Sequence, residues 1–151
     1  MNRTIQGLVA VLGRVLLCTI FLMSAMGNKI PHFNDVAGLM GKVGIPQPRF
    51  MLVGAIVFLI AGSLSVILGF RPRIGAALLL IFLVLATYYF HNFWAQSDPK
   101  AQQEQMIQFM KNLGLMGAML LVIANGAGPM SLDGRRAGVS EEALATAGTT
   151  R

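Results

Sequence analysis

Two long apolar runs separated by three residues decide the fold of this chain: FMLVGAIVFLIAGSLSVILGF at residues 50–70 and IGAALLLIFLVLATYYFHNFW at residues 74–94. Each run has the length of about 20 residues that a helix needs to cross the apolar core of a bilayer. Only Arg71, Pro72 and Arg73 separate the runs, and so short a connection makes the second helix return antiparallel to the first. The sequence therefore predicts a transmembrane helical hairpin.

Two further apolar runs, at residues 8–26 and 106–127, flank this hairpin. Arg3 before the first run would also suit a cleaved signal peptide. However, Arg14 interrupts that run and three more spans follow, so we interpret it as an anchor that is kept. We expect an all-α integral membrane four-helix bundle with antiparallel neighbouring helices. Its domain covers residues 1–130, and a polar flexible tail covers residues 131–151.

The composition is that of a protein in lipid. The chain is 55% hydrophobic and 12% charged, with nine Phe and ten Met, and its mean hydropathy is +0.66. These values exclude a conventional soluble domain, which carries about 25% charged residues, and they exclude a disordered chain. The net charge of +6 is scattered over loops and span ends. We therefore expect contacts with anionic lipid and no nucleic-acid partner.

The connections carry recognisable signals. Residues 27–49 hold three prolines and are too polar to span, so they form a loop that can include a short amphipathic helix on the membrane surface. In SDPKAQQEQ, Ser97 or Asp98 is the expected N-cap of the fourth helix and Pro99 its first residue.

An even number of spans places both termini on one side. Six Lys and Arg residues fall on that side and four on the other, with the compact Arg71–Arg73 turn on the side of the termini. The positive-inside rule then favours a bacterial inner membrane protein with both termini in the cytoplasm.

Two cations lie within the expected spans, Arg14 in the first and Lys111 in the fourth, whereas all six acidic residues lie outside them. Charges in lipid are functional candidates by default. Because arginine cannot escape by deprotonation, Arg14 needs carbonyls, hydroxyls, water, an anionic ligand or another subunit around it.

A second group of polar residues gathers on the side away from the termini, at the ends of the first and third spans and the start of the fourth. Within it, Tyr88, His91 and Asn92 share one helical spacing and Gln108, Lys111 and Asn112 repeat it, so each triplet is expected to form one helix face. A pocket built from them would suit a quinone head group or another flat carbonyl compound, with His91 or Lys111 exchanging a proton. The alternative is that these residues only anchor the helices at the water boundary. The ligand-binding candidates are Arg14, Lys29, Tyr88, His91, Asn92, Trp94, Gln108, Lys111 and Asn112.

Other chemistry is not indicated. Cys18 is the single cysteine, which argues against CxxC redox chemistry. His32 and His91 alone make a poor metal site, and no flavin, nucleotide or nucleophilic-triad motif is recognised.

Four stretches resemble the DoxX family of small bacterial four-helix membrane proteins: GRVLLCTIFLMSAMGNKI at 13–30, GSLSVILGFRPRIGAALL at 62–79, YYFHNFW at 88–94 and QMIQFMKNLGLMGAMLL at 105–121. The family is named for its similarity to the DoxD subunit of an archaeal thiosulfate:quinone oxidoreductase. The resemblance implies functional positions at Arg14 and Lys29, in the HxFW element (His91, Phe93 and Trp94), and in the KN element (Lys111 and Asn112). Many relatives carry a Glu in the second helix where this chain has Leu59.

Three functions follow as hypotheses. The first is a redox-associated subunit that binds quinone and exchanges electrons through a partner protein. The second is a noncatalytic scaffold or assembly factor, or a homo-oligomer, that packs through small-residue faces such as Gly54 and Gly62 or Gly114 and Ala118, with Arg14 meeting an acid on the partner. The third is a small-solute transporter.

Overall fold

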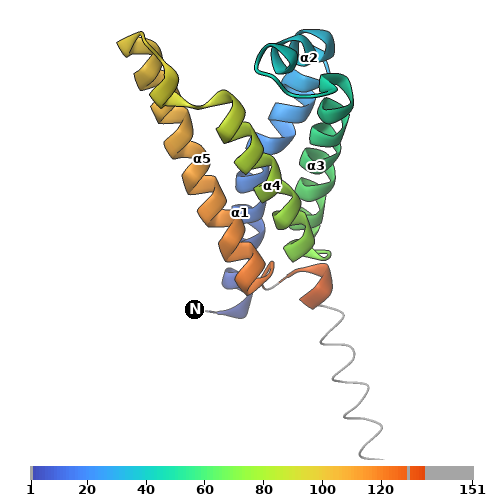
Figure 1. The fold of residues 1–151 in the computed structure, drawn as a ribbon. Helices are drawn as coiled ribbons and strands as arrows, with labels where there is room; N and C mark the ends of the chain where they lie inside the picture. Colours follow the sequence, from blue (N-terminus) through green and yellow to red (C-terminus); the bar gives the residue numbers. More distant parts are fainter. Residues whose placement is uncertain (1, 129, 135–151) are drawn as a thin grey trace, which may run out of the picture.

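The computed structural model describes residues 2–128 and 130–134 and is helical throughout its regular elements (Figure 1). Among the described residues, four helices are long and apolar enough to cross a membrane, so the predicted all-α membrane fold is confirmed. In chain order the elements are α1 (Arg3–Ser24), a π-helical turn (Ala25–Lys29), α2 (Phe33–Lys42), α3 (Pro48–Leu68), α4 (Pro72–Phe90), a 3-10 turn (Phe93–Ala95) and α5 (Pro99–Asn125).

The helix ends follow the local sequence. α3 stops at Gly69, which adopts the left-handed conformation (φ 65°) that glycine tolerates best. Arg71 is also left-handed (φ 47°) and leads into Pro72, the first residue of α4. Asp98 caps α5 as expected, because its Oδ2 accepts a hydrogen bond of 2.9 Å from the Ala101 N–H.

The long helices pack in the spatial order α1, α3, α4, α5, since close contacts join each helix to the next in that series (Figure 1). The tightest approach is between α3 and α4. A Cβ on Gly62 would lie 2.9 Å from the Gly75 carbonyl oxygen, and one on Gly75 would lie 2.7 Å from that of Gly62. Side chains from all four long helices share one core, which includes Cys18, Phe21, Leu59, Leu83 and Met119.

The short helix α2 lies across the end of the bundle where α3 begins (Figure 1). Its buried Ala37 and Met40 pack against Leu52 of α3 and form a second, smaller core. The rest of α2 is mostly exposed, as the amphipathic pattern of this loop indicates.

The C-terminal segment differs from the expected tail. Residues 130–134 turn back over the α3–α4 turn, where the Asp133 N–H donates to the Gly69 carbonyl oxygen (3.1 Å) and Asp133 Oδ2 accepts from the Arg71 N–H (2.9 Å). Ser131 is buried there. The expected tail therefore begins too early, because the polar groups of 131–134 pair with the backbone that the turn exposes. Residues 135–151 lie outside the described residues.

The first spanning helix is continued by its π-helical turn. The Ile30 N–H bonds to the Ala25 carbonyl oxygen, five residues earlier, at 2.9 Å. This wider turn carries Lys29, whose Nζ donates to Ser24 Oγ (2.7 Å) and lies 5.2 Å from the centre of the Phe82 ring. π-helical turns of this kind are rare and recur at functional positions.

Candidate functional site

Polar side chains from α4 and α5 meet across their interface near the end of the bundle where α2 lies. Asn112 Nδ2 donates to Thr87 Oγ1 at 2.9 Å, and both residues are buried. Nearer the α4–α5 connection, His91 Nδ1 and Gln105 Oε1 are 2.8 Å apart. The two helices are thus joined by two hydrogen bonds between side chains.

The residues of α5 that turn toward α4 are Gln105, Gln108, Phe109 and Asn112, all at least half-buried, while Met106, Ile107, Met110 and Lys111 are exposed. This is the i, i+3, i+4, i+7 spacing of one helix face. Lys111 therefore lies beside this face, and its Nζ donates to the Gln108 side-chain oxygen one turn earlier.

The expected face of Tyr88, His91 and Asn92 does not form, because α4 ends at Phe90. His91 is the C-cap (φ −124°, ψ 35°) and Asn92 has φ −79° and ψ 70°, so the helical spacing no longer relates them to Tyr88. Tyr88 is 67% exposed and packs edge-on against Tyr89, with their ring centres 5.1 Å apart. His91 instead follows Thr87 by four residues, and its backbone N–H donates to the Thr87 carbonyl oxygen (3.1 Å).

Three aromatic rings stand beside the His91–Gln105 pair. Phe93, Trp94 and Phe109 pack edge-to-face, with ring centres 5.2 Å (Phe93–Trp94), 5.4 Å (Phe93–Phe109) and 6.0 Å (Trp94–Phe109) apart. Trp94 is 59% exposed. This aromatic cluster places apolar ring faces and edges at the junction of α4 and α5, with the Trp94 ring exposed.

The pair leaves one nitrogen of His91 available. When Gln105 Oε1 accepts from the Nδ1–H of a neutral imidazole, Nε2 carries a lone pair. Within residues 2–128 and 130–134, Nε2 has no hydrogen-bond partner. The junction can therefore accept a hydrogen bond from a hydroxyl group held against the aromatic cluster. We call His91, Gln105, Phe93, Trp94 and Phe109 the junction site.

Sequence reasoning missed Thr87 and Gln105. Both carry a signal: Thr87 precedes His91 by one helical turn, and Gln105 precedes Asn112 by two. Lys29 does not join the junction site, because it contacts Ser24 and Phe82. Asn92 is half-buried near the site, with no side-chain bond to its members.

Arg14 lies toward the end of the bundle opposite α2, and only 5% of its surface is exposed. Its Nε donates to the Ala10 carbonyl oxygen (3.2 Å) and its Nη2 to that of Met130 (3.1 Å). Helical side chains point toward the N-terminus, which brings the guanidinium down to Gly69, where an added Cβ would lie 2.5 Å from Nη1. The charge therefore sits level with the α3–α4 turn, beside the negative end of the α3 dipole.

The position of Leu59 is informative here. Leu59 is fully buried in the common core. It precedes Gly69 by ten residues, or about 15 Å of helix. A glutamate at this place would thus lie far from the guanidinium of Arg14.

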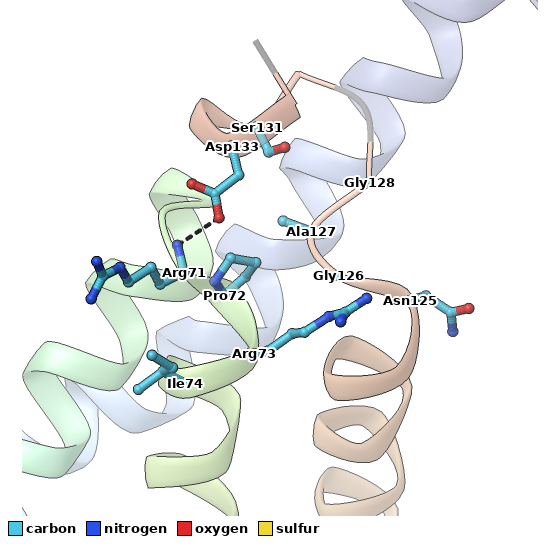
Figure 2. A pocket seen from close by; sticks show the side chains of 10 residues that line it. All are labelled: Arg71, Pro72, Arg73, Ile74, Asn125, Gly126, Ala127, Gly128, Ser131 and Asp133. Carbon is cyan, nitrogen blue, oxygen red and sulfur yellow. Dashed lines mark hydrogen bonds between the residues drawn. The ribbon is translucent and has the colours of Figure 1, made fainter. Parts of the chain in front are cut away.

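Two hollows flank the Asn125–Gly128 segment at this same end. One, of about 640 Å³, lies between the start of α4 and the end of α5, where the Arg73 side chain reaches toward α5 and Asp133 toward the Arg71 N–H (Figure 2). The other, of about 400 Å³, lies between α1 and α5 and includes Arg14.

The family model described as DoxX matches residues 9–92. Inner membrane protein YphA of Escherichia coli (strain K12) is 31% identical over 125 residues, covering 82% of this chain and 87% of YphA. Inner membrane protein YqjF of the same strain is 30% identical over 120 residues, with coverages of 80% and 85%. A Surfeit locus protein 4 homolog of Drosophila melanogaster is 27% identical over 113 residues, 70% of this chain and 42% of that protein. No solved structure matches the chain significantly.

Proposed function

Because this chain belongs to the DoxX family of integral membrane proteins, we propose that it is a redox-associated membrane subunit whose junction site binds a quinone or a similar hydrophobic carbonyl compound. The observation that carries the proposal is the His91–Gln105 pair, 2.8 Å between Nδ1 and Oε1, beside three edge-packed aromatic rings.

The chemistry of the site fits the reduced form of such a ligand. A quinol hydroxyl can donate to His91 Nε2, which the bond to Gln105 leaves as the accepting nitrogen. The Phe93 and Trp94 rings offer apolar contacts for a flat ring. The isoprenoid tail would stay in the surrounding lipid. Electrons would pass to a partner protein.

Trp94 provides the readout, since it is the single tryptophan of the chain and belongs to the site. Purified protein in mild detergent is titrated with a short-chain quinol and quinone while tryptophan fluorescence is recorded. We expect saturable quenching by at least one of them. Nonspecific partitioning into detergent quenches linearly and does not saturate.

Matched glutamine variants separate the site from the rest of α5. Gln105→Ala and His91→Ala should weaken saturable binding roughly threefold to tenfold, the value of one hydrogen bond. Gln103→Ala, at an exposed position of the same helix, should leave it unchanged. If both site variants bind as tightly as the parent protein, the junction is no quinone site.

A noncatalytic scaffold is the second candidate, and one observation favours it. Gly114 and Gly117 of α5 face open space, because an added Cβ on either meets no atom within 4 Å. Small residues let helices approach closely in membranes, so this face suits a helix of another subunit. Gly114→Leu with Gly117→Leu would then remove a specific co-purifying membrane protein while quinol quenching stayed intact.

The proposed location is the bacterial inner membrane with both termini in the cytoplasm. Its support is that the two Escherichia coli relatives are inner membrane proteins by name, and that Arg71 and Arg73 lie at the same end of the bundle as residues 126–128 and 130–134 (Figure 2).

A further inference from the structure

The groove between α1 and α5 has apolar walls and one cationic end. Ala10 and Leu17 line it from α1, and Leu121 and Val122 line it from α5, with Arg14 and Asn125 as the polar members. Close packing joins α1 to α3 and α5 to α4, while α1 and α5 do not form such a pair. The groove is shallow and open along its length, with a volume of about 400 Å³.

The guanidinium of Arg14 is incompletely satisfied. Its two hydrogen bonds go to backbone carbonyls, which leaves one Nη2 N–H undonated. Nη1 is buried beside Gly69, without a hydrogen-bond partner in the described part of the chain. The one contact of 4.0 Å or less between a basic and an acidic side chain among those residues joins His32 to Asp35 and does not involve Arg14. A buried cation with unpaired donors is costly, and arginine keeps its proton. An acceptor carrying negative charge would remove this cost.

The surroundings favour an anion from the lipid. This end of the bundle holds three arginines, Arg14, Arg71 and Arg73, and one described acidic residue, Asp133. The Asp133 carboxylate already accepts a hydrogen bond from the backbone N–H of Arg71. The charge sits level with the α3–α4 turn, the depth at which lipid head groups lie beside a hairpin of this kind. A phosphodiester also matches the fork of a guanidinium.

We propose that the α1–α5 groove binds an anionic phospholipid. One acyl chain lies against Leu17 and Leu121. The phosphate oxygens accept hydrogen bonds from the Arg14 guanidinium and from the Asn125 Nδ2–H that is not donated to the Leu121 carbonyl oxygen. The site is distinct from the junction site, which lies at the opposite end of the bundle.

The test is native mass spectrometry of the purified full chain with phosphatidylglycerol and with phosphatidylcholine of the same acyl chains. We expect the protein to retain phosphatidylglycerol roughly tenfold better, the value of a charge-assisted bond. Arg14→Leu should abolish this preference. Gly13→Phe should do the same while leaving Arg14 in place, because Gly13 lines the groove and its added side chain meets open space.

Gly38→Phe is the matched control, since Gly38 also faces open space but lies outside the groove, and it should retain the preference. If Arg14→Leu fails to fold, Gly13→Phe decides alone. Equal retention of the two lipids by the parent protein, or an unchanged preference in Gly13→Phe, would overturn the proposal. So would a spectrum in which a second copy or another polypeptide, lost in Gly13→Phe, takes the place of lipid.

Discussion

Asn112 of α5 donates a hydrogen bond of 2.9 Å to the hydroxyl of Thr87 on α4, and both side chains are buried where the two helices meet. The bond fixes the register of α5 on α4, the one long helix with which it packs closely in the described residues. It thereby holds Gln105, two turns earlier on the same face, against His91.

The Asn112–Thr87 bond should be measurable as a coupling energy. Asn112→Leu, Thr87→Val and the double variant form a cycle. We expect a coupling of about 0.6 kcal/mol and at most about 1.7 kcal/mol, the mean and maximum found for side-chain hydrogen bonds between membrane helices. The losses of unfolding free energy in the two single variants should together exceed the loss in the double variant, because each single variant leaves the other polar group unpaired. Unfolding in increasing denaturing detergent provides the free energies. Additive single effects would show that the bond contributes nothing.

The α3–α4 crossing should reject side chains at its glycines. Gly62→Ala places a methyl group 2.8 Å from Leu79 Cγ and 2.9 Å from the Gly75 oxygen, so we expect a loss of about 1–3 kcal/mol from overpacking. Gly117→Ala adds the same methyl group in open space and should be neutral or stabilising by up to about 1 kcal/mol. The melting temperature should therefore fall in Gly62→Ala and stay the same or rise in Gly117→Ala.

The Asp133 carboxylate should protect the turn between α3 and α4. Asp133→Ala removes the acceptor of the Arg71 N–H, and hydrogen bonds to charged groups are worth about 1.5–3 kcal/mol. Hydrogen exchange at the Arg71 amide should therefore accelerate roughly tenfold or more, while amides in the middle of α3 stay protected. An unchanged rate at Arg71 would mean that residues 130–134 do not stabilise this turn.

The orientation can be read with single introduced cysteines, because Cys18 is fully buried. Gln102→Cys, exposed at the start of α5, should react with a membrane-impermeant maleimide added to spheroplasts. Leu132→Cys, at a position 43% exposed, should react only after the membrane is opened. The reverse pattern would place the termini outside the cytoplasm.

Local signals predicted the fold well. The three residues between two apolar runs are enough to require a hairpin, and Asp98 with Pro99 marks the start of α5 because capping depends on neighbouring residues alone. Short motifs such as HNFW and FMKNL indicate the family, and the family match over residues 9–92 together with the relatives from Escherichia coli confirms it.

Contacts between distant segments were harder to predict. Spacing grouped Tyr88 with His91 as if α4 continued, whereas the helix ends at Phe90 and aligns His91 with Thr87 instead. The position of Arg14 in the sequence gives only the depth of its Cα along the helix. The guanidinium is lower, because a long side chain in a helix reaches back by a turn, and its partner Met130 is distant in sequence.

The π-helical turn after Ser24 amounts to one inserted residue. Each residue of an α-helix advances by about 100° around the axis, so a single extra residue in residues 25–29 rotates everything that follows by that angle. Removing one residue there would restore the α-helical pitch, swing Lys29 away from the Phe82 ring and redirect the chain entering α2. The length of this stretch, more than its composition, therefore sets how α2 is laid over the bundle.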